Sequence, residues 1–164
     1  NKKSAGTKLV CFDSFFNNPG VYEVEMGTPM KKVLNDIGGG FKEPIKALQI
    51  GGPLGGVIPI DEAEKLNLDF QEFTAAGFML GHASIVSIPK DFPMVEYIHH
   101  LFEFTAEESC GKCFPGRLGS YRGKEMFDQA KNKTAKIPLK LLNELLITMK
   151  KGCLCALCLS LIHI

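Results

Sequence analysis

The chain has 164 residues, enough for one ordinary domain or two small ones. Its 19 lysines and arginines nearly balance 18 aspartates and glutamates, so no basic field indicates a nucleic-acid partner. No apolar run approaches the roughly 20 residues that span a bilayer, so we expect no direct membrane insertion. The first residue is not Met and no signal peptide is recognisable, which indicates a fragment of a larger chain.

The first residues predict a β-hairpin followed by a helix. Residues 7–12 and 21–25 have the composition and alternation of strands, and the turn signal Asn-Asn-Pro-Gly lies between them at 17–20. Thr28 and Pro29 then predict a helix start, with Thr28 as the N-cap and Pro29 at the first helical position.

Two further strands are expected in this half of the chain, at residues 47–50 and 84–88. Residues 61–76 between them are acidic and are expected to be helical or irregular. Strands and one crossing helix in under a hundred residues predict an α+β fold. A β-grasp (ubiquitin-like) domain over residues 6–90 is the most economical arrangement.

The periodicity changes after Phe92. Apolar residues then recur at helical spacing, and further helices are expected at 118–131 and 138–151. We therefore predict a second, all-helical domain over residues 91–157. Because two helices of similar length return the chain close to where it started, cysteines far apart in sequence can meet there.

The six cysteines are unevenly placed, since five of them form two groups in the last third of the chain. They are Cys110 and Cys113 in the first group, and Cys153, Cys155 and Cys158 in the second. This distribution favours a metal site in a reducing compartment over a framework of disulfides. On spacing alone, zinc held by Cys110, Cys113, Cys155 and Cys158 competes with an iron–sulfur cluster.

Several motifs resemble one known protein family, and this resemblance favours the iron–sulfur cluster over zinc. Two cysteine-containing runs carry the resemblance: Ala-Glu-Glu-Ser-Cys-Gly-Lys-Cys-Phe-Pro at 106–115 and Leu-Cys-Ala-Leu at 154–157. They resemble segments of the NADH- and flavin-binding subunit of respiratory complex I and of its relatives in NAD-linked hydrogenases and formate dehydrogenases. The segments at 18–23, 51–56 and 77–81 match the same family in the same order. The likeness covers residues 6 to 157.

The resemblance implies a soluble-ligand-binding β-grasp domain followed by a helical domain that carries a [4Fe-4S] cluster. Carried over residue by residue, the implied ligands in this chain are Cys110, Cys113 and Cys155. The family's third ligand falls on Gly116, which has no side chain, so the cluster would be incomplete unless Cys153 or Cys158 substitutes. Residues 158–164 depart from the family and are interpreted as a non-native or truncated tail.

The function implied by the resemblance is electron relay within an NADH:quinone oxidoreductase-type enzyme. The FMN and NADH sites would lie in an N-terminal domain outside this sequence, so the chain alone would be inactive, and no catalytic or flavin-binding residue is expected in it. Implied partners are a thioredoxin-like 2Fe-2S subunit and a multi-cluster iron–sulfur subunit. The implied location is the cytoplasm or, within a complex, the cytoplasmic face of the membrane. The competing hypothesis is a β-grasp adaptor with a structural zinc site and no redox role.

Overall fold

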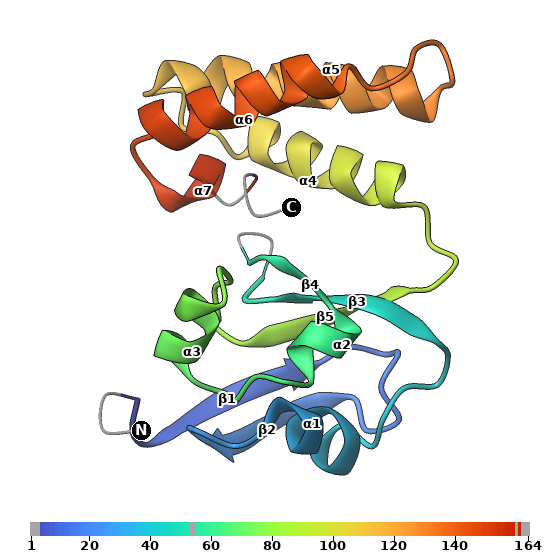
Figure 1. Cartoon of the computed structure of the whole chain (residues 1–164), viewed down its shortest axis with the longest axis vertical. Helices are drawn as coiled ribbons and strands as arrows, with labels where there is room; N and C mark the ends of the chain where they lie inside the picture. The colour runs from blue at the N-terminus through green and yellow to red at the C-terminus, as the bar shows by residue number, and fades with distance from the viewer. Residues whose placement is uncertain (1–3, 53–54, 160, 162–164) are drawn as a thin grey trace. The chain divides into compact units, whose positions relative to one another are not determined.

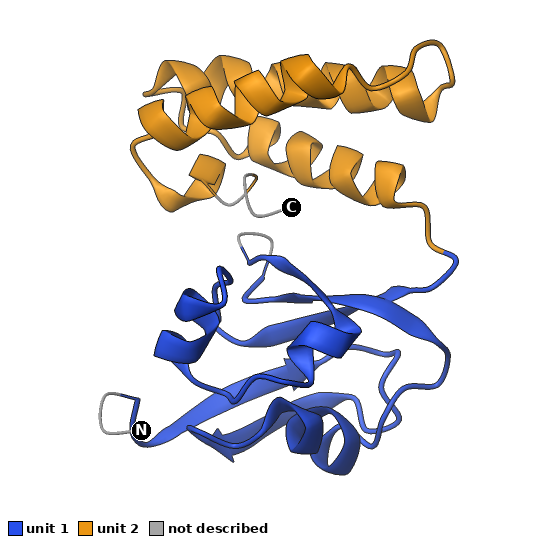
Figure 2. Cartoon of the chain, in the orientation of Figure 1, with its two compact units in different colours: residues 1–91 blue, residues 92–164 orange. Residues whose placement is uncertain are grey.

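The computed structural model describes residues 4–52, 55–159 and 161. The chain divides into two compact units, residues 1–91 and 92–164 (Figure 2). A five-stranded sheet with short helices forms the first unit, and the described residues of the second form helices joined by loops (Figure 1). The expected combination of a sheet with helices is therefore confirmed.

The sheet of the first unit has the order β2-β1-β5-β3-β4. Its strands are β1 (Thr7–Phe12), β2 (Gly20–Glu25), β3 (Ile45–Ile50), β4 (Val57–Pro59) and β5 (Ser84–Pro89). β1 and β2 pair antiparallel, as the predicted hairpin requires, whereas the central β1 and β5 are parallel. Val10 and Phe12 point into the core while Leu9 is exposed, as the two-residue period of a strand dictates.

Short helical segments close the core of this unit. They are α1 (Met30–Lys32), the π-helical turn η1 (Val33–Ile37), α2 (Ile60–Ala63) and α3 (Phe70–Ala75). The predicted N-cap at Thr28 is wrong, because α1 is preceded by Pro29 and has no side-chain cap. The backbone of Thr28 instead bonds Glu25 and Leu68. The carboxylate of Asp69 is a true cap, accepting the N–H groups of Gln71 and Glu72 in α3.

The second unit consists of helices that pack on an apolar core. They are α4 (Met94–Glu107), the π-helical turn η2 (Pro115–Gly119), α5 (Ser120–Lys131), α6 (Leu139–Gly152) and α7 (Ala156–Leu159). Both predicted helices are present, although residues 118 and 119 belong to η2 and not to α5.

The described part of the tail packs into this core. Cys158 and Leu161 are 2% and 1% exposed and lie with Leu101, Phe102 and Phe127. The interpretation of residues 158–164 as non-native stays a prediction, and residues 160 and 162–164 of it lie outside the described residues.

Helices α4 and α5 approach each other closely at a glycine. The rings of Phe102 and Phe127 stack with centroids 5.5 Å apart. Gly123 lies against Phe102, and a Cβ atom at this position would overlap the Phe102 ring. The packing of α4 on α5 therefore depends on the missing side chain of Gly123.

We expect Gly123→Ala to lower the free energy of unfolding by about 1–3 kcal/mol, because the added methyl group overpacks the core. Helix propensity alone would favour alanine by ~1 kcal/mol, so the sign of the change tests the close approach. Urea unfolding measures it, with Arg122→Ala on the exposed neighbouring position as the control, expected to change stability by less than about 0.5 kcal/mol. A Gly123→Ala protein as stable as wild type would contradict this packing.

Candidate metal centre

The first cysteine segment is the loop that follows α4. Gly111, between Cys110 and Cys113, has φ +74°, a left-handed conformation that glycine adopts without strain. Its N–H donates to the Ser109 hydroxyl over 3.3 Å. This local turn bends the chain directly after Cys110, which is exposed, and Cys113 follows just before η2.

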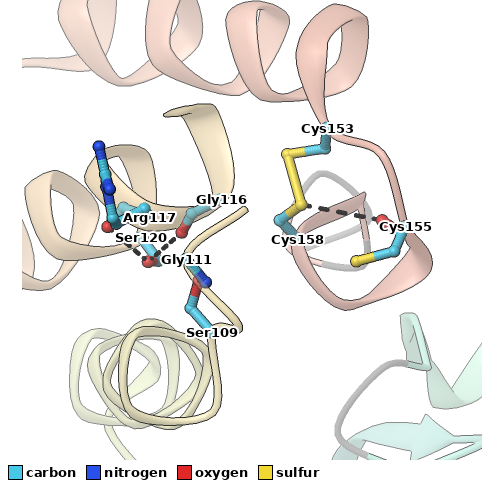
Figure 3. The surroundings of a disulfide bond; sticks show 8 residues. All are labelled: Ser109, Gly111, Gly116, Arg117, Ser120, Cys153, Cys155 and Cys158. Atoms are coloured by element: carbon cyan, nitrogen blue, oxygen red, sulfur yellow. Dashed lines mark hydrogen bonds between the residues drawn. A yellow bond between two sulfur atoms is a disulfide. The ribbon is translucent and has the colours of Figure 1, made fainter. Parts of the chain in front are cut away.

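The π-helical turn η2 is fixed by Ser120, the first residue of α5. The side chain of Ser120 is fully buried, and its hydroxyl donates to the carbonyl oxygen of Gly116 over 2.6 Å (Figure 3). A bond from a serine hydroxyl to a carbonyl four residues earlier is a local device that bends helical backbone. Gly116 is consequently held in a defined position, buried, three residues after Cys113.

The second cysteine segment follows α6 and returns to η2. Gly152 makes this approach close, because a Cβ atom there would lie 2.8 Å from Cγ of Pro115. The backbone N–H of Cys153 bonds the Met149 carbonyl, which ends the helix. The short helix α7 then carries Cys158 back against η2.

The structure brings three cysteines together. The sulfur atoms of Cys113, Cys153 and Cys158 all lie within 4.8 Å of one another, and this is the one group of three or more cysteine, histidine or acidic ligand atoms that the described residues form. Of the three sequence-predicted ligands, only Cys113 is in this group. Cys110 and Cys155 are exposed and lie outside this group. Both are also ligands in the zinc alternative, so the group contains only Cys113 and Cys158 of the four cysteines proposed for zinc.

Cys153 and Cys158 are joined by a disulfide, with Cα atoms 6.2 Å apart (Figure 3). The sequence favoured a metal site over a framework of disulfides, and this one pair forms because the turn into α7 brings residues five apart within bridging distance. The remaining cysteines, Cys11, Cys110, Cys113 and Cys155, are free.

Hydrogen bonds from the backbone favour the thiolate of Cys113. The N–H of Leu154 donates to this sulfur and lowers the pKa of the Cys113 thiol, with a further contribution from the N–H of Gly116, while burial acts in the opposite direction. A thiolate is the form in which cysteine binds metals. The bond from Leu154 also ties the second cysteine segment to the first.

Position 116 faces the sulfur group directly. A Cβ atom at Gly116 would lie 2.8 Å from Sγ of Cys113 and 3.3 Å from Sγ of Cys158. The backbone of Gly116 is therefore oriented so that a side chain there would point at these sulfurs.

An all-sulfur donor set of this kind fits zinc or an iron–sulfur cluster. Thiolates around one zinc ion lie about 3.8 Å apart, given a Zn–S bond of about 2.3 Å. The three sulfurs therefore lie near enough to one another to bind one soft metal ion once the disulfide is reduced.

The comparisons with known proteins identify the family. Residues 96–163 match the family model described as the NADH-ubiquinone oxidoreductase-F iron-sulfur binding region. The NADP-reducing hydrogenase subunit HndC of Solidesulfovibrio fructosivorans is 34% identical over 94% of this chain and 32% of its own length. A subunit of the NADH-quinone oxidoreductase of Escherichia coli (strain K12) is 38% identical over 71% of this chain and 26% of its own length. The chain belongs to this family.

A solved structure agrees with the assignment. The NAD+-reducing [NiFe]-hydrogenase in the H2-reduced state superposes with a TM-score of 0.85 at 25% identity, over 99% of this chain and 28% of the hydrogenase chain. The chain spans about a third or less of the length of the curated relatives it matches. The described residues include no helix long and apolar enough to cross a membrane.

Sequence reasoning placed Cys158 beside Cys113 in the zinc alternative and named Cys153 or Cys158 as substitutes for the missing ligand, but it did not group these three cysteines, because neither Cys153 nor Cys158 matches a ligand position of the family. The predicted return of the chain after the helix at 138–151 allowed the later cysteines to meet the first cysteine segment, but it did not distinguish which of them would do so. The ligand assignment of Cys110, Cys113 and Cys155 stays a prediction.

The disulfide predicts a thiol count. In oxidised protein unfolded without reductant, iodoacetamide should alkylate four cysteines, and after reduction all six. The mass of the intact chain gives the number of alkylated cysteines before and after reduction. In a Cys153→Ala control every remaining cysteine should react without reductant, because Cys158 has lost its partner. Six alkylated cysteines in unreduced wild type would contradict the Cys153–Cys158 pairing.

Proposed function

We propose that this chain is the electron-relay part of an NADH dehydrogenase-type flavoprotein subunit, with a [4Fe-4S] cluster held by Cys110, Cys113 and Cys155. The observation that carries the proposal is the match of residues 96–163 to an iron–sulfur binding region, over the two segments whose cysteines converge. A bound cluster carries one electron at a time, and a flavin is needed between it and a two-electron hydride donor. In this proposal FMN and NADH bind outside the chain, which has no activity alone.

The residues of the chain would hold the cluster through thiolates on two segments. Cys113 is prepared for this role by the N–H groups of Leu154 and Gly116, which stabilise its negative charge. The side chain of Met149 is fully buried on α6 and faces η2 at Gly119, so solvent is excluded from that side. Cys110 and Cys155 are exposed, and each would turn its sulfur toward the cluster on binding.

We assign the first unit as a β-grasp, soluble-ligand-binding-like domain over residues 6–90, and residues 91–157 as the cluster-binding helical domain. Supporting the first assignment are the mixed order β2-β1-β5-β3-β4 and the parallel pairing of the first and last strands. Its role would be packing or docking. The related proteins are named as subunits, which supports partners of the kind expected: a thioredoxin-like 2Fe-2S subunit and a multi-cluster iron–sulfur subunit. The complex would lie in the cytoplasm or on the cytoplasmic face of the membrane.

Cluster content tests the proposal. After anaerobic reconstitution with ferrous iron and sulfide under a dithiol reductant, wild type should bind iron and sulfide and become brown, with a colour that dithionite bleaches. Replacing any one of the proposed ligands should lower cluster occupancy about tenfold or more, in Cys110→Ala, Cys113→Ala and Cys155→Ala alike. Mutation of a residue that only hydrogen-bonds a metal ligand already lowers metal affinity about 10-fold to 100-fold. Cys11→Ala, on β1 of the first unit, is the matched control and should leave occupancy unchanged.

A structural zinc site is the second candidate, favoured by three sulfurs that all lie within 4.8 Å of one another. It predicts a colourless protein that retains one zinc per chain through anaerobic purification and takes up no iron and sulfide. Metal analysis by mass spectrometry separates the two outcomes. Stoichiometric zinc with no cluster after reconstitution would overturn the electron-relay proposal.

A further inference from the structure

We infer that the thiolate of Cys158 is a cluster ligand and supplies the sulfur that Gly116 cannot. The inference rests on the proposed function and goes beyond it, since the three ligands implied by the family do not include Cys158. What decides it is where this residue of α7 lies relative to η2.

Position 116 is where a ligand is missing. Gly116 is buried and its backbone is fixed by the Ser120 hydroxyl, so the direction of its absent Cβ atom is well defined. That direction leads to Sγ of Cys113 at 2.8 Å. A donor that replaced a side chain at 116 would have to reach this same volume from another segment.

Cys158 is the residue that reaches it. Its Sγ lies 3.3 Å and its Cβ 3.7 Å from the Cβ position of residue 116, whereas no atom of Cys153 is among the three nearest. Figure 3 shows Gly116 on η2 facing the end of Cys158 on the neighbouring segment. The side chain is 2% exposed, so it is directed into the unit and not into solvent.

The placement of Cys158 is supported on both sides along the chain. The helix α7, which contains Cys158, contacts both α6 and η2. The second cysteine segment starts where Gly152 closely approaches Pro115. After Cys158, Leu161 is buried in the same core as Phe102. Cys158 is therefore held against η2 by packing as well as by its disulfide to Cys153.

Ligation requires the disulfide to be open. A dithiol reductant such as dithiothreitol supplies two electrons and two protons: the Cys153–Cys158 bond breaks, both cysteines become thiols, and the reductant closes to its own disulfide. Cys158 then loses its proton as it binds iron. Cys153 is released with it and remains a free thiol.

The test uses the full chain, reduced with dithiothreitol and reconstituted anaerobically with ferrous iron and sulfide. Wild type should bind about four iron atoms per chain, as a complete [4Fe-4S] cluster requires. Cys158→Ala should bind three iron atoms or fewer, losing at least a quarter of the iron, with the EPR signal of an oxidised three-iron cluster. Cys153→Ala is the matched control, one residue of the same disulfide, and should retain the wild-type content.

A rescue variant separates loss of a ligand from loss of folding. Gly116→Cys combined with Cys158→Ala places a thiol where the glycine stands and should restore the wild-type iron content. Circular dichroism of each apoprotein checks that the helices are retained. Restoration by this double variant supports a ligand exchange between positions 116 and 158, because a merely structural role of Cys158 would not be rescued there.

Each contrary result has a distinct meaning. If Cys158→Ala keeps the full cluster, or Cys153→Ala loses it instead, the role of Cys158 is overturned while the cluster itself stands. If wild type binds no iron and Gly116→Cys alone does, Cys158 does not replace the missing ligand, and the cluster site remains. If neither protein binds iron and sulfide, the proposed function is overturned, and this inference with it.

Discussion

The second unit depends on the close contact between η2 and the segments around the end of α6. This contact is possible because three positions have no side chain. A Cβ atom at Gly119 would lie 3.1 Å from Cγ of Met149, at Gly152 2.8 Å from Cγ of Pro115, and at Gly116 3.3 Å from the Cys158 sulfur. Backbones can approach this closely only where side chains are absent. The meeting of two cysteine segments that lie far apart in the sequence follows from that approach.

The same constraint sets the chemistry of the centre. Gly116 brings η2 near Cys158, and by being glycine it also removes the thiol that the family resemblance leads one to expect there. The sulfurs gathered at this point can form a disulfide or bind a metal, and these outcomes exclude each other at Cys158. The redox state of one pair, Cys153 and Cys158, therefore decides how many thiolates the centre offers.

Much of the secondary structure was predictable, because apolar residues recur with a clear helix or strand period wherever one face of an element is buried. The strand at Thr7–Phe12 and the helix at Leu139–Gly152 are examples. The strand Val57–Pro59 was not predicted, since three residues are too few to show an alternating pattern. The predicted cap at Thr28 is wrong because tertiary bonds to Leu68 engage its backbone. Burial by a neighbouring helix was not predictable either: His99 of α4 is 6% exposed, because α5 packs against α4.

The sequence by itself determined the kinds of element, the clustering of cysteines and, through several ordered motifs, the family to which the chain belongs. Those properties are encoded in spacing and residue type, which are local. Only the tertiary structure decided which sulfurs meet. The grouping of Cys113 with Cys153 and Cys158, and the exposure of Cys110 and Cys155, depend on side-chain direction and on how closely η2, α6 and α7 pack. Cysteine spacing does not encode that packing, because glycines at three other positions permit it.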